Sequence, residues 1–225
     1  MINVAKNWNP KQALLKELLN DKNKTDEALR LCLELHSLVH SSEVSKTNTA
    51  TYDDILWDNL SEQTFRVFSD KKKTSIAWNL WHITRIEDIT ANILIANGNQ
   101  VLDGSWLKKL NTNIHDTGNA MSDQEIINFS NQINMQELRN YRTSVGKKTQ
   151  EIIRNIKACD LKRKMNHSQL DRIINEGGVL KVEGSIWLID FWGKKNVAGI
   201  LLMPITRHQI VHLNDALRIK EKYMK

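Results

Sequence analysis

Two histidines near the C-terminus have the spacing of metal ligands. The stretch Pro204–Lys220 reads PITRHQIVHLNDALRIK and places His208 four residues before His212. Residues at i and i+4 lie one turn apart on the same face of a helix, so both imidazoles can point at one place. Two neutral imidazoles make half of a zinc-type site. HxxxH is a short pattern that often occurs without a metal, so the prediction requires a third ligand from elsewhere in the chain.

A helix must position this pair. Pro204 suits a first helical position, because its missing N–H would be unpaired there. Alternatively, a helix that begins near Asn196 and ends near Lys222 passes through Pro204 with a kink. In either case one stripe of the helix carries both histidines among apolar residues: Ile205, His208, His212, Ala216 and Ile219.

A third histidine interrupts the apolar face of an earlier predicted helix. This helix begins at Thr74 or Ser75 and ends before Gly98, since glycine commonly terminates helices. One face of it carries Trp78, His82, Arg85, Ile89 and Ile93.

Two more long helices complete the predicted fold. Apolar residues recur with helical period over residues 28–41 and 135–158. Residues 99–122 are polar with little helical pattern, which suits a long crossover between helices. We therefore predict an all-α protein, a four-helix bundle with short extra helices. Residues 1–225 would form a single domain, with residues 1–23 as an N-terminal helical extension.

Composition narrows the class of protein. The chain has 225 residues with 32 basic and 26 acidic side chains, a formal net charge of +6. This mixed charge permits nucleic-acid binding but does not argue for it. Cys32 and Cys159 are expected to be free thiols. No apolar run approaches the roughly 20 residues of a membrane helix. We expect a cytoplasmic protein without a nucleic-acid or membrane partner.

Two segments together resemble the DinB/YfiT-like superfamily of metal-dependent enzymes. They are SIAWNLWHITRIED (residues 75–88) and VAGILLMPITRHQIVHLNDALRI (residues 197–219). The resemblance extends in element order from about residue 24 to the end of the chain. It implies up-down-down-up topology with a long crossover, and a divalent metal held by His82, His208 and His212. Nickel and zinc are the expected metals, and nitrogen ligands do not choose between them.

The resemblance also implies an activity. Characterised relatives include thiol-dependent transferases and isomerases, in which a small-molecule thiol such as bacillithiol or mycothiol is the co-substrate. By this analogy the metal would bind the thiol as thiolate, which would attack an electrophilic substrate, and the protein would be a homodimer. The alternatives are a non-catalytic bundle that binds a metal or small molecule, as a sensor or dimer scaffold, and a metal-dependent hydrolase.

Several other residues are candidates for supporting roles. Family members often carry Gly-Gln shortly after the last histidine, whereas this chain has Asn214 and Asp215. Asp215 could accept the second N–H of a ligating histidine, or lie on a solvated face. Arg85, one turn after His82, could bind a substrate carboxylate or phosphate, and Trp78 could form a pocket wall.

The remaining charged and histidine residues have simpler expectations. Glu87 and Asp88 are expected to be solvated. His36 and His40 form a second HxxxH pattern. This pair could be an alternative metal pair, part of the outer shell of the site, or residues favoured at a helix end by the helix dipole.

Overall fold

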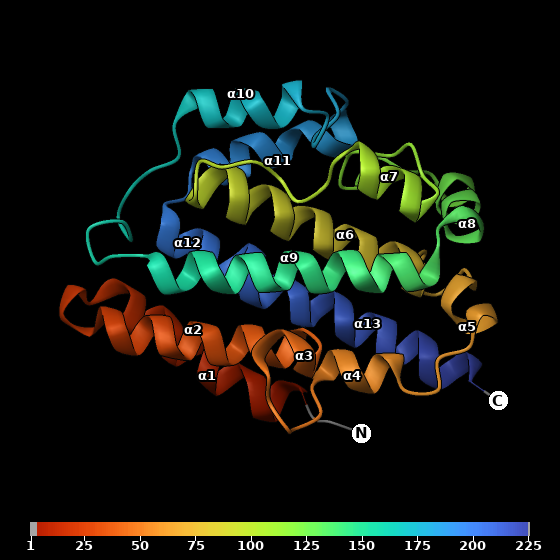
Figure 1. Cartoon of the computed structure of the whole chain (residues 1–225), viewed down its shortest axis with the longest axis horizontal. Helices are drawn as coiled ribbons and strands as arrows, with labels where there is room; N and C mark the ends of the chain where they lie inside the picture. The colour runs from red at the N-terminus through yellow and green to blue at the C-terminus, as the bar shows by residue number, and fades with distance from the viewer. Residues whose placement is uncertain (1–3, 225) are drawn as a thin grey trace.

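Four long helices form the frame of the molecule. A computed structural model describes residues 4–224. The long helices are α2 (Thr25–Val39), α6 (Ile76–Asp88) extended by the π-helical η2 (Ile89–Ile95), α9 (Met135–Asn155), and α12 (Val197–Leu202) continued through the π-helical η3 (Met203–Arg207) into α13 (His208–Tyr223). In Figure 1, α6 and α9 run in one direction while α2 and α13 run in the other. The predicted all-α bundle with up-down-down-up order is confirmed.

Further helices, most of them short, cover the frame. They are α1 (Val4–Asn20), η1 (Lys22–Lys24), α3 (Ser42–Ser45), α4 (Tyr52–Trp57), α5 (Glu62–Arg66), α7 (Gly104–Leu110), α8 (Asp123–Gln132), α10 (His167–Asn175) and α11 (Glu183–Gly193). The helix α1 packs on α2 and α12. Over the described residues there is no strand, and no helix there has the length and apolarity to cross a membrane.

The crossover is more ordered than the sequence predicted. Its residues 104–110 form α7, which begins after Asp103. The carboxylate of Asp103 accepts hydrogen bonds from the backbone N–H groups of Ser105 and Trp106, both at 2.9 Å. Because this cap satisfies N–H groups that a helix start leaves unpaired, a short helix forms in a stretch with weak apolar periodicity.

The helix α6 lies at the centre of the bundle and is buried all round. It begins after Ser75, whose hydroxyl accepts a hydrogen bond from the N–H of Trp78 at 2.9 Å. Every residue from 76 to 95 is buried, including the charged ones. The expectation that Glu87 and Asp88 are solvated is therefore wrong, because α9, α13 and other helices enclose α6 on all sides.

Buried charges on α6 are matched by partners from other elements. The Arg85 guanidinium pairs with the Asp88 carboxylate at 3.0 Å. The hydroxyl of Tyr141 on α9 donates to Asp88 at 2.6 Å. The backbone N–H groups of Val101 and Leu102 in the crossover also donate to Asp88, at 2.7 and 2.9 Å. Asp88 thus fixes the start of the crossover against the bundle.

A second buried arginine connects five helices. Arg142 of α9 donates to Asp53 of α4 at 2.8 Å and to Gln209 of α13 at 3.0 Å. It also donates to the hydroxyl of Thr84 on α6 at 3.3 Å and to the carbonyl of Val39 on α2. The arginine is 2% exposed and Asp53 is 1% exposed. A buried ion pair with several directional hydrogen bonds fixes the relative positions of the helices that contribute to it.

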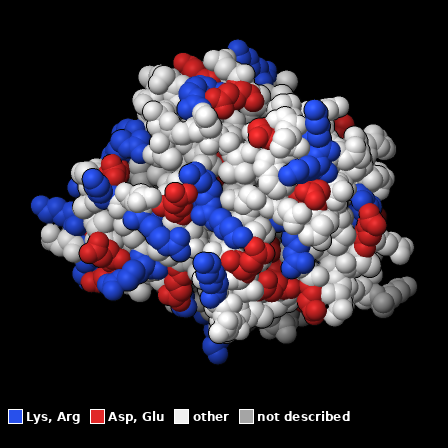
Figure 2. Space-filling model, in the orientation of Figure 1, with Lys and Arg blue, Asp and Glu red and all other residues white. Residues whose placement is uncertain are grey.

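The surface carries mixed charge. Figure 2 shows basic and acidic side chains interspersed over one face of the molecule. The exposed pairs Lys147–Glu43 and Lys148–Glu151 are examples of opposite charges that lie side by side on the surface. On this face the net charge of +6 does not gather into a single basic patch.

Replacing Arg142 by methionine should lower the free energy of unfolding by about 3–5 kcal/mol, because Asp53 would stay buried without its partner. Urea unfolding followed by circular dichroism measures the loss. The matched control is Lys148→Met, which breaks an exposed pair whose side chains are 48% and 61% exposed. The control should lose less than about 1 kcal/mol. Equal losses in the two variants would contradict the role given to Arg142.

Candidate metal centre

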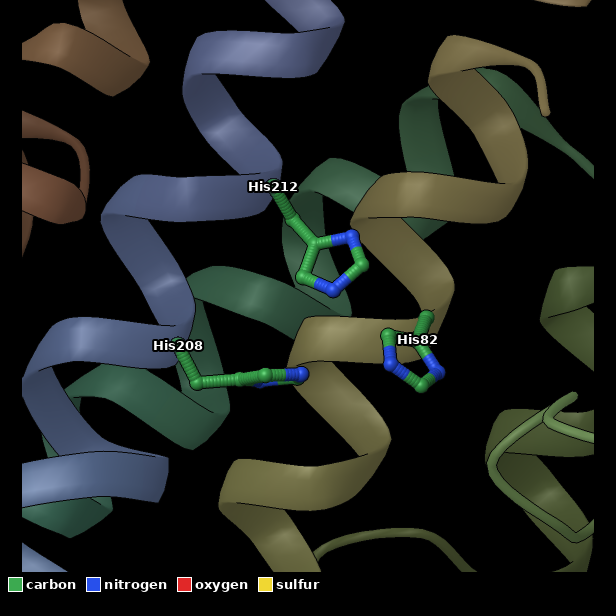
Figure 3. A group of neighbouring side chains, drawn as sticks. All are labelled: His82, His208 and His212. Atoms are coloured by element: carbon green, nitrogen blue, oxygen red, sulfur yellow. The ribbon is translucent and has the colours of Figure 1, made fainter. Parts of the chain in front are cut away.

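The three predicted histidines meet between α6 and α13. One ring nitrogen from each of His82, His208 and His212 lies within 4.8 Å of the others. The centroid of the His82 ring is 5.0 Å from that of His208 and 4.7 Å from that of His212. Figure 3 shows the imidazole of His82 approaching from α6 and the other two from α13. The fold thus brings together His82 and His208, which lie 126 positions apart in the sequence.

A backbone carbonyl sets the tautomer of His82. Its Nδ1 lies 2.8 Å from the carbonyl oxygen of Thr117 in the crossover. A carbonyl oxygen only accepts hydrogen bonds, so Nδ1 must carry the proton and donate it. In the neutral ring the lone pair is then on Nε2, which Figure 3 shows pointing toward the other two histidines.

An asparagine does the same for His212. The Nδ1 atom of His212 lies 2.8 Å from Oδ1 of Asn79. The amide nitrogen of Asn79 donates to the carbonyl of Ser75 at 2.7 Å and to the hydroxyl of Thr74 at 2.9 Å. These contacts identify which end of the amide is oxygen, so Nδ1 of His212 is the donor. The lone pair of His212 is therefore on Nε2.

The direction of His208 depends on a wide helical turn. Its N–H bonds the carbonyl of Met203, five residues earlier, within η3. This segment contains Pro204, which has no N–H to donate. The carbonyl of Leu202 accepts hydrogen bonds from the side chain of Gln12 at 2.8 Å and from the hydroxyl of Thr206 at 3.0 Å. The helix passes through Pro204, which is the kinked alternative of the sequence analysis, and the extra residue in the turn rotates His208 relative to α12.

A glutamine holds the two histidine-bearing helices together. Gln209, which follows His208, donates to the carbonyl of Ile83 at 3.0 Å. Ile83 follows His82 on α6, so this bond lies directly beside the centre. The side-chain oxygen of Gln209 accepts a hydrogen bond from Arg142 of α9, so Gln209 also links α13 to α9.

The environment keeps all three imidazoles neutral. Burial lowers the pKa of His82 to about 3, and the charge of His212 acts in the same direction. Burial lowers the pKa of His212 to about 4. Burial, aided by His82 and His212, also holds the pKa of His208 well below its ordinary value. A lowered imidazole pKa favours the neutral ring, so each ring offers a lone pair at pH 7.

These side chains fit a divalent metal. Three neutral imidazoles converge, and two of them have the second nitrogen bonded to a fixed acceptor, as is usual for metal-ligating histidines. The Nδ1 atom of His208 is buried and has no hydrogen-bond partner among the described residues. Three nitrogen ligands leave coordination positions open, which is typical of catalytic rather than structural sites.

The residue that supports His212 differs from the one predicted. Asp215 does not take this role, because its carboxylate pairs with Lys72 at 2.6 Å and lies 3.9 Å from Arg218. Asn79 takes it instead. The sequence held a signal for Asn79, since it lies three residues before His82 on the same face of α6. It held none for the Thr117 carbonyl, which is a backbone group of a distant segment.

The two proposed substrate contacts lie in different surroundings. The ring of Trp78 stacks on His82 with centroids 4.6 Å apart and an interplanar angle of 9°. The nitrogens of the Arg85 guanidinium bond protein groups, among them the His115 carbonyl and Gln100. A substrate would have to displace one of these bonds to reach Arg85. Trp78 is thus beside the centre, and Arg85 belongs to an internal network.

The second HxxxH pair forms a separate group. His36 and His40 are both fully buried, and each lies 2.8 Å from an oxygen of Glu87. Glu87 supplies the third candidate ligand of this group. The sequence did not indicate it, because Glu87 was expected to be solvated.

Comparison with known proteins identifies a family for the chain. The profile of the DinB superfamily matches residues 50–216, which is more than half of the chain and includes His82, His208 and His212. No curated protein matches the chain.

Replacing Asn79 by alanine should weaken metal binding roughly 10–100-fold, because His212 would lose the acceptor that fixes its ring. Competitive titration against a chromophoric chelator measures the affinity. Asn155→Ala is the matched control, since Asn155 is exposed on α9. Unchanged affinity in a folded Asn79→Ala protein would show that the bond to His212 has no part in metal binding.

Metal affinity should depend only weakly on pH in the acidic range. Three imidazoles with an ordinary pKa near 6.5 would together lose on the order of a thousandfold in affinity between about pH 7.5 and about pH 5.5. Since the pKa values of His82 and His212 are lowered to about 3 and about 4, and that of His208 is also lowered, the rings stay neutral over this range. We expect a change below about twofold. Chelator titrations at both pH values test this, and a loss of tenfold or more would contradict it.

Proposed function

Because the chain belongs to the DinB superfamily, we propose that it is a metal-dependent enzyme that activates a small-molecule thiol for transfer to an electrophile. His82, His208 and His212 would hold the divalent cation. Trp78 would line the place where the substrates bind.

One observation carries this proposal: three neutral imidazoles converge, and fixed acceptors hold the rings of His82 and His212. His82 is buried and His208 and His212 are half-buried. Directing three neutral lone pairs at one place in these surroundings is costly unless something uses those lone pairs. A metal ion does so. The open positions left by three ligands then favour catalysis over a purely structural role.

A divalent cation held there would lower the pKa of a bound thiol or water. The residues of the chain would supply the surroundings for this chemistry. Thr117 and Asn79 orient the imidazoles, and Gln209 holds α13 against α6. The Trp78 indole covers one face of His82, which limits access of water on that side and offers an apolar surface to an electrophilic substrate.

The identity of the metal, the dimer and the choice among the alternative functions stay predictions. Nickel and zinc are the metals that we expect. Homodimer formation follows from the resemblance to the superfamily. A hydrolase that uses activated water would need the same three ligands. A non-catalytic sensor or scaffold would also keep the fold and the metal.

Metal analysis of the untagged protein tests the centre. We expect close to one nickel or zinc ion bound per chain at this site, and loss of this ion in both His82→Ala and His208→Ala. The control His167→Ala, in an exposed histidine, should retain it. If the parent and the control hold no ion at this site after incubation with each divalent metal, the metal-dependent reading is wrong.

Activity assays then separate the reactions. The metal-loaded protein is incubated with bacillithiol or mycothiol and a panel of electrophiles, and S-conjugates are followed by mass spectrometry. We expect conjugate formation that falls at least about a hundredfold in His82→Ala and not in His167→Ala. Metal-dependent hydrolysis without a thiol would favour the hydrolase, and a loaded protein inactive in both assays would favour the sensor or scaffold.

A further inference from the structure

A second group of metal-ligating side chains lies outside the three-histidine centre. His36 in the last turn of α2, and His40 just after it, both meet Glu87 of α6. The Nε2 atoms of His36 and His40 lie 2.8 Å from Oε1 and Oε2 of Glu87, respectively. The two imidazoles stack with their centroids 4.3 Å apart. One ligand atom from each of the three side chains lies within 4.8 Å of the others.

This group is independent of the first centre. The two sets of ligands share no residue. Glu87 lies five positions after His82, about 140° further round α6, so the two side chains leave the helix in different directions. His36 and His40 also precede residue 50, where the match to the DinB superfamily begins. Two of the three residues of the group therefore lie outside the family match, and only Glu87 lies inside it.

The charge of Glu87 is balanced differently from that of other buried carboxylates. Asp53 pairs with Arg142 and Asp88 pairs with Arg85, so each faces a permanent positive charge. The ion-pair partners of Glu87 are two imidazoles, and all three side chains have 0% exposure. A buried carboxylate requires a counter-charge. Imidazoles can supply it either by binding a proton or by helping to bind a cation.

The surroundings of the rings allow them to act as ligands. The Nδ1 atoms of both rings are buried, with no hydrogen-bond partner among the described residues. No protein donor therefore prevents the ring protons from lying on Nδ1 while the Nε2 lone pairs face a cation. The His40 ring also fits against Gly146 of α9, where a Cβ atom would come within 2.5 Å of Nδ1. Gly146 thus makes room for this ring in the core.

We propose that His36, His40 and Glu87 form a second, closed site for a zinc-type divalent cation, distinct from the three-histidine centre. Two imidazole nitrogens and both oxygens of a bidentate carboxylate give four donor atoms, the usual number at a structural zinc. Because the ligands are fully buried, no substrate reaches them. The cation would join the end of α2 to the centre of α6 and so hold the outer helix on the bundle.

The full-length protein, stripped with a chelator and reloaded with zinc alone, tests this site directly. Crystals measured at the zinc absorption edge should show anomalous density between His36, His40 and Glu87. Nitrogen-15 NMR should show both rings protonated at Nε2 before loading and at Nδ1 after it. Crystals of the zinc-loaded protein without density at this position, or rings that keep their Nε2 protons at saturating zinc, would overturn the proposal in favour of a triad held by protons alone.

Variants separate the two sites. The double variant His82→Ala/His208→Ala should still bind one zinc ion per chain, at the second site. Glu87→Gln keeps the size of the side chain and removes its charge, and it should weaken the second site at least tenfold. The matched control is Glu151→Gln on the exposed face of α9, which should leave the zinc affinity of the second site unchanged. Zinc affinity of the second site that is equal in Glu87→Gln and the control would also overturn the proposal.

The two proposals can fail separately. Density at His82, His208 and His212 tests the metal centre of the proposed function, and density at His36, His40 and Glu87 tests the second site. If Glu87→Gln fails to fold, the diffraction and NMR measurements on the parent protein still decide. Thermal unfolding provides a further readout, since zinc should raise the melting temperature of the His82→Ala/His208→Ala variant by about 5 °C or more.

Discussion

The bundle depends on the buried guanidinium of Arg142. This one group bonds Asp53, Thr84, Gln209 and the carbonyl of Val39, and so links α9 to α4, α6, α13 and α2. Hydrophobic contacts tolerate small sliding movements of helices, whereas a buried charge with several directional hydrogen bonds allows few positions. Gln209 also donates a hydrogen bond to the carbonyl of Ile83, the residue after His82, so this constraint extends to the metal centre. The separation of α6 and α13 beside the histidines is therefore set by polar geometry as well as by packing.

Burial gives the three histidines their chemical character. Removal from water disfavours the charged imidazole, so the rings stay neutral, and the acceptors at Thr117 and Asn79 direct the lone pairs of His82 and His212 inward. The same burial would make these lone pairs unfavourable if nothing occupied them. A neutral, nitrogen-lined centre with one buried and two half-buried histidines is thus both costly for the fold and suited to a metal with open positions.

The central helix α6 serves several partners at once. His82 faces α13, Arg85 and Asp88 bond the crossover and α9, and Glu87 meets the end of α2. Each of these four side chains has a partner from another part of the chain. A helix with polar residues on every face can be buried only when such partners are in place. This requirement fixes both the rotation of α6 and the order of the helices around it.

The sequence by itself determined the four long helices and the three candidate ligands. Helical period and the HxxxH spacing are local properties, and they place His208 and His212 on one face wherever the helix lies. Only the tertiary structure decided what surrounds them. The partner of His212 is Asn79 rather than Asp215, because Lys72 draws Asp215 away. Glu87 is buried because distant helices enclose α6. A backbone carbonyl such as that of Thr117 has no residue type that could reveal it, since every residue carries one, and its position depends on how the whole crossover folds.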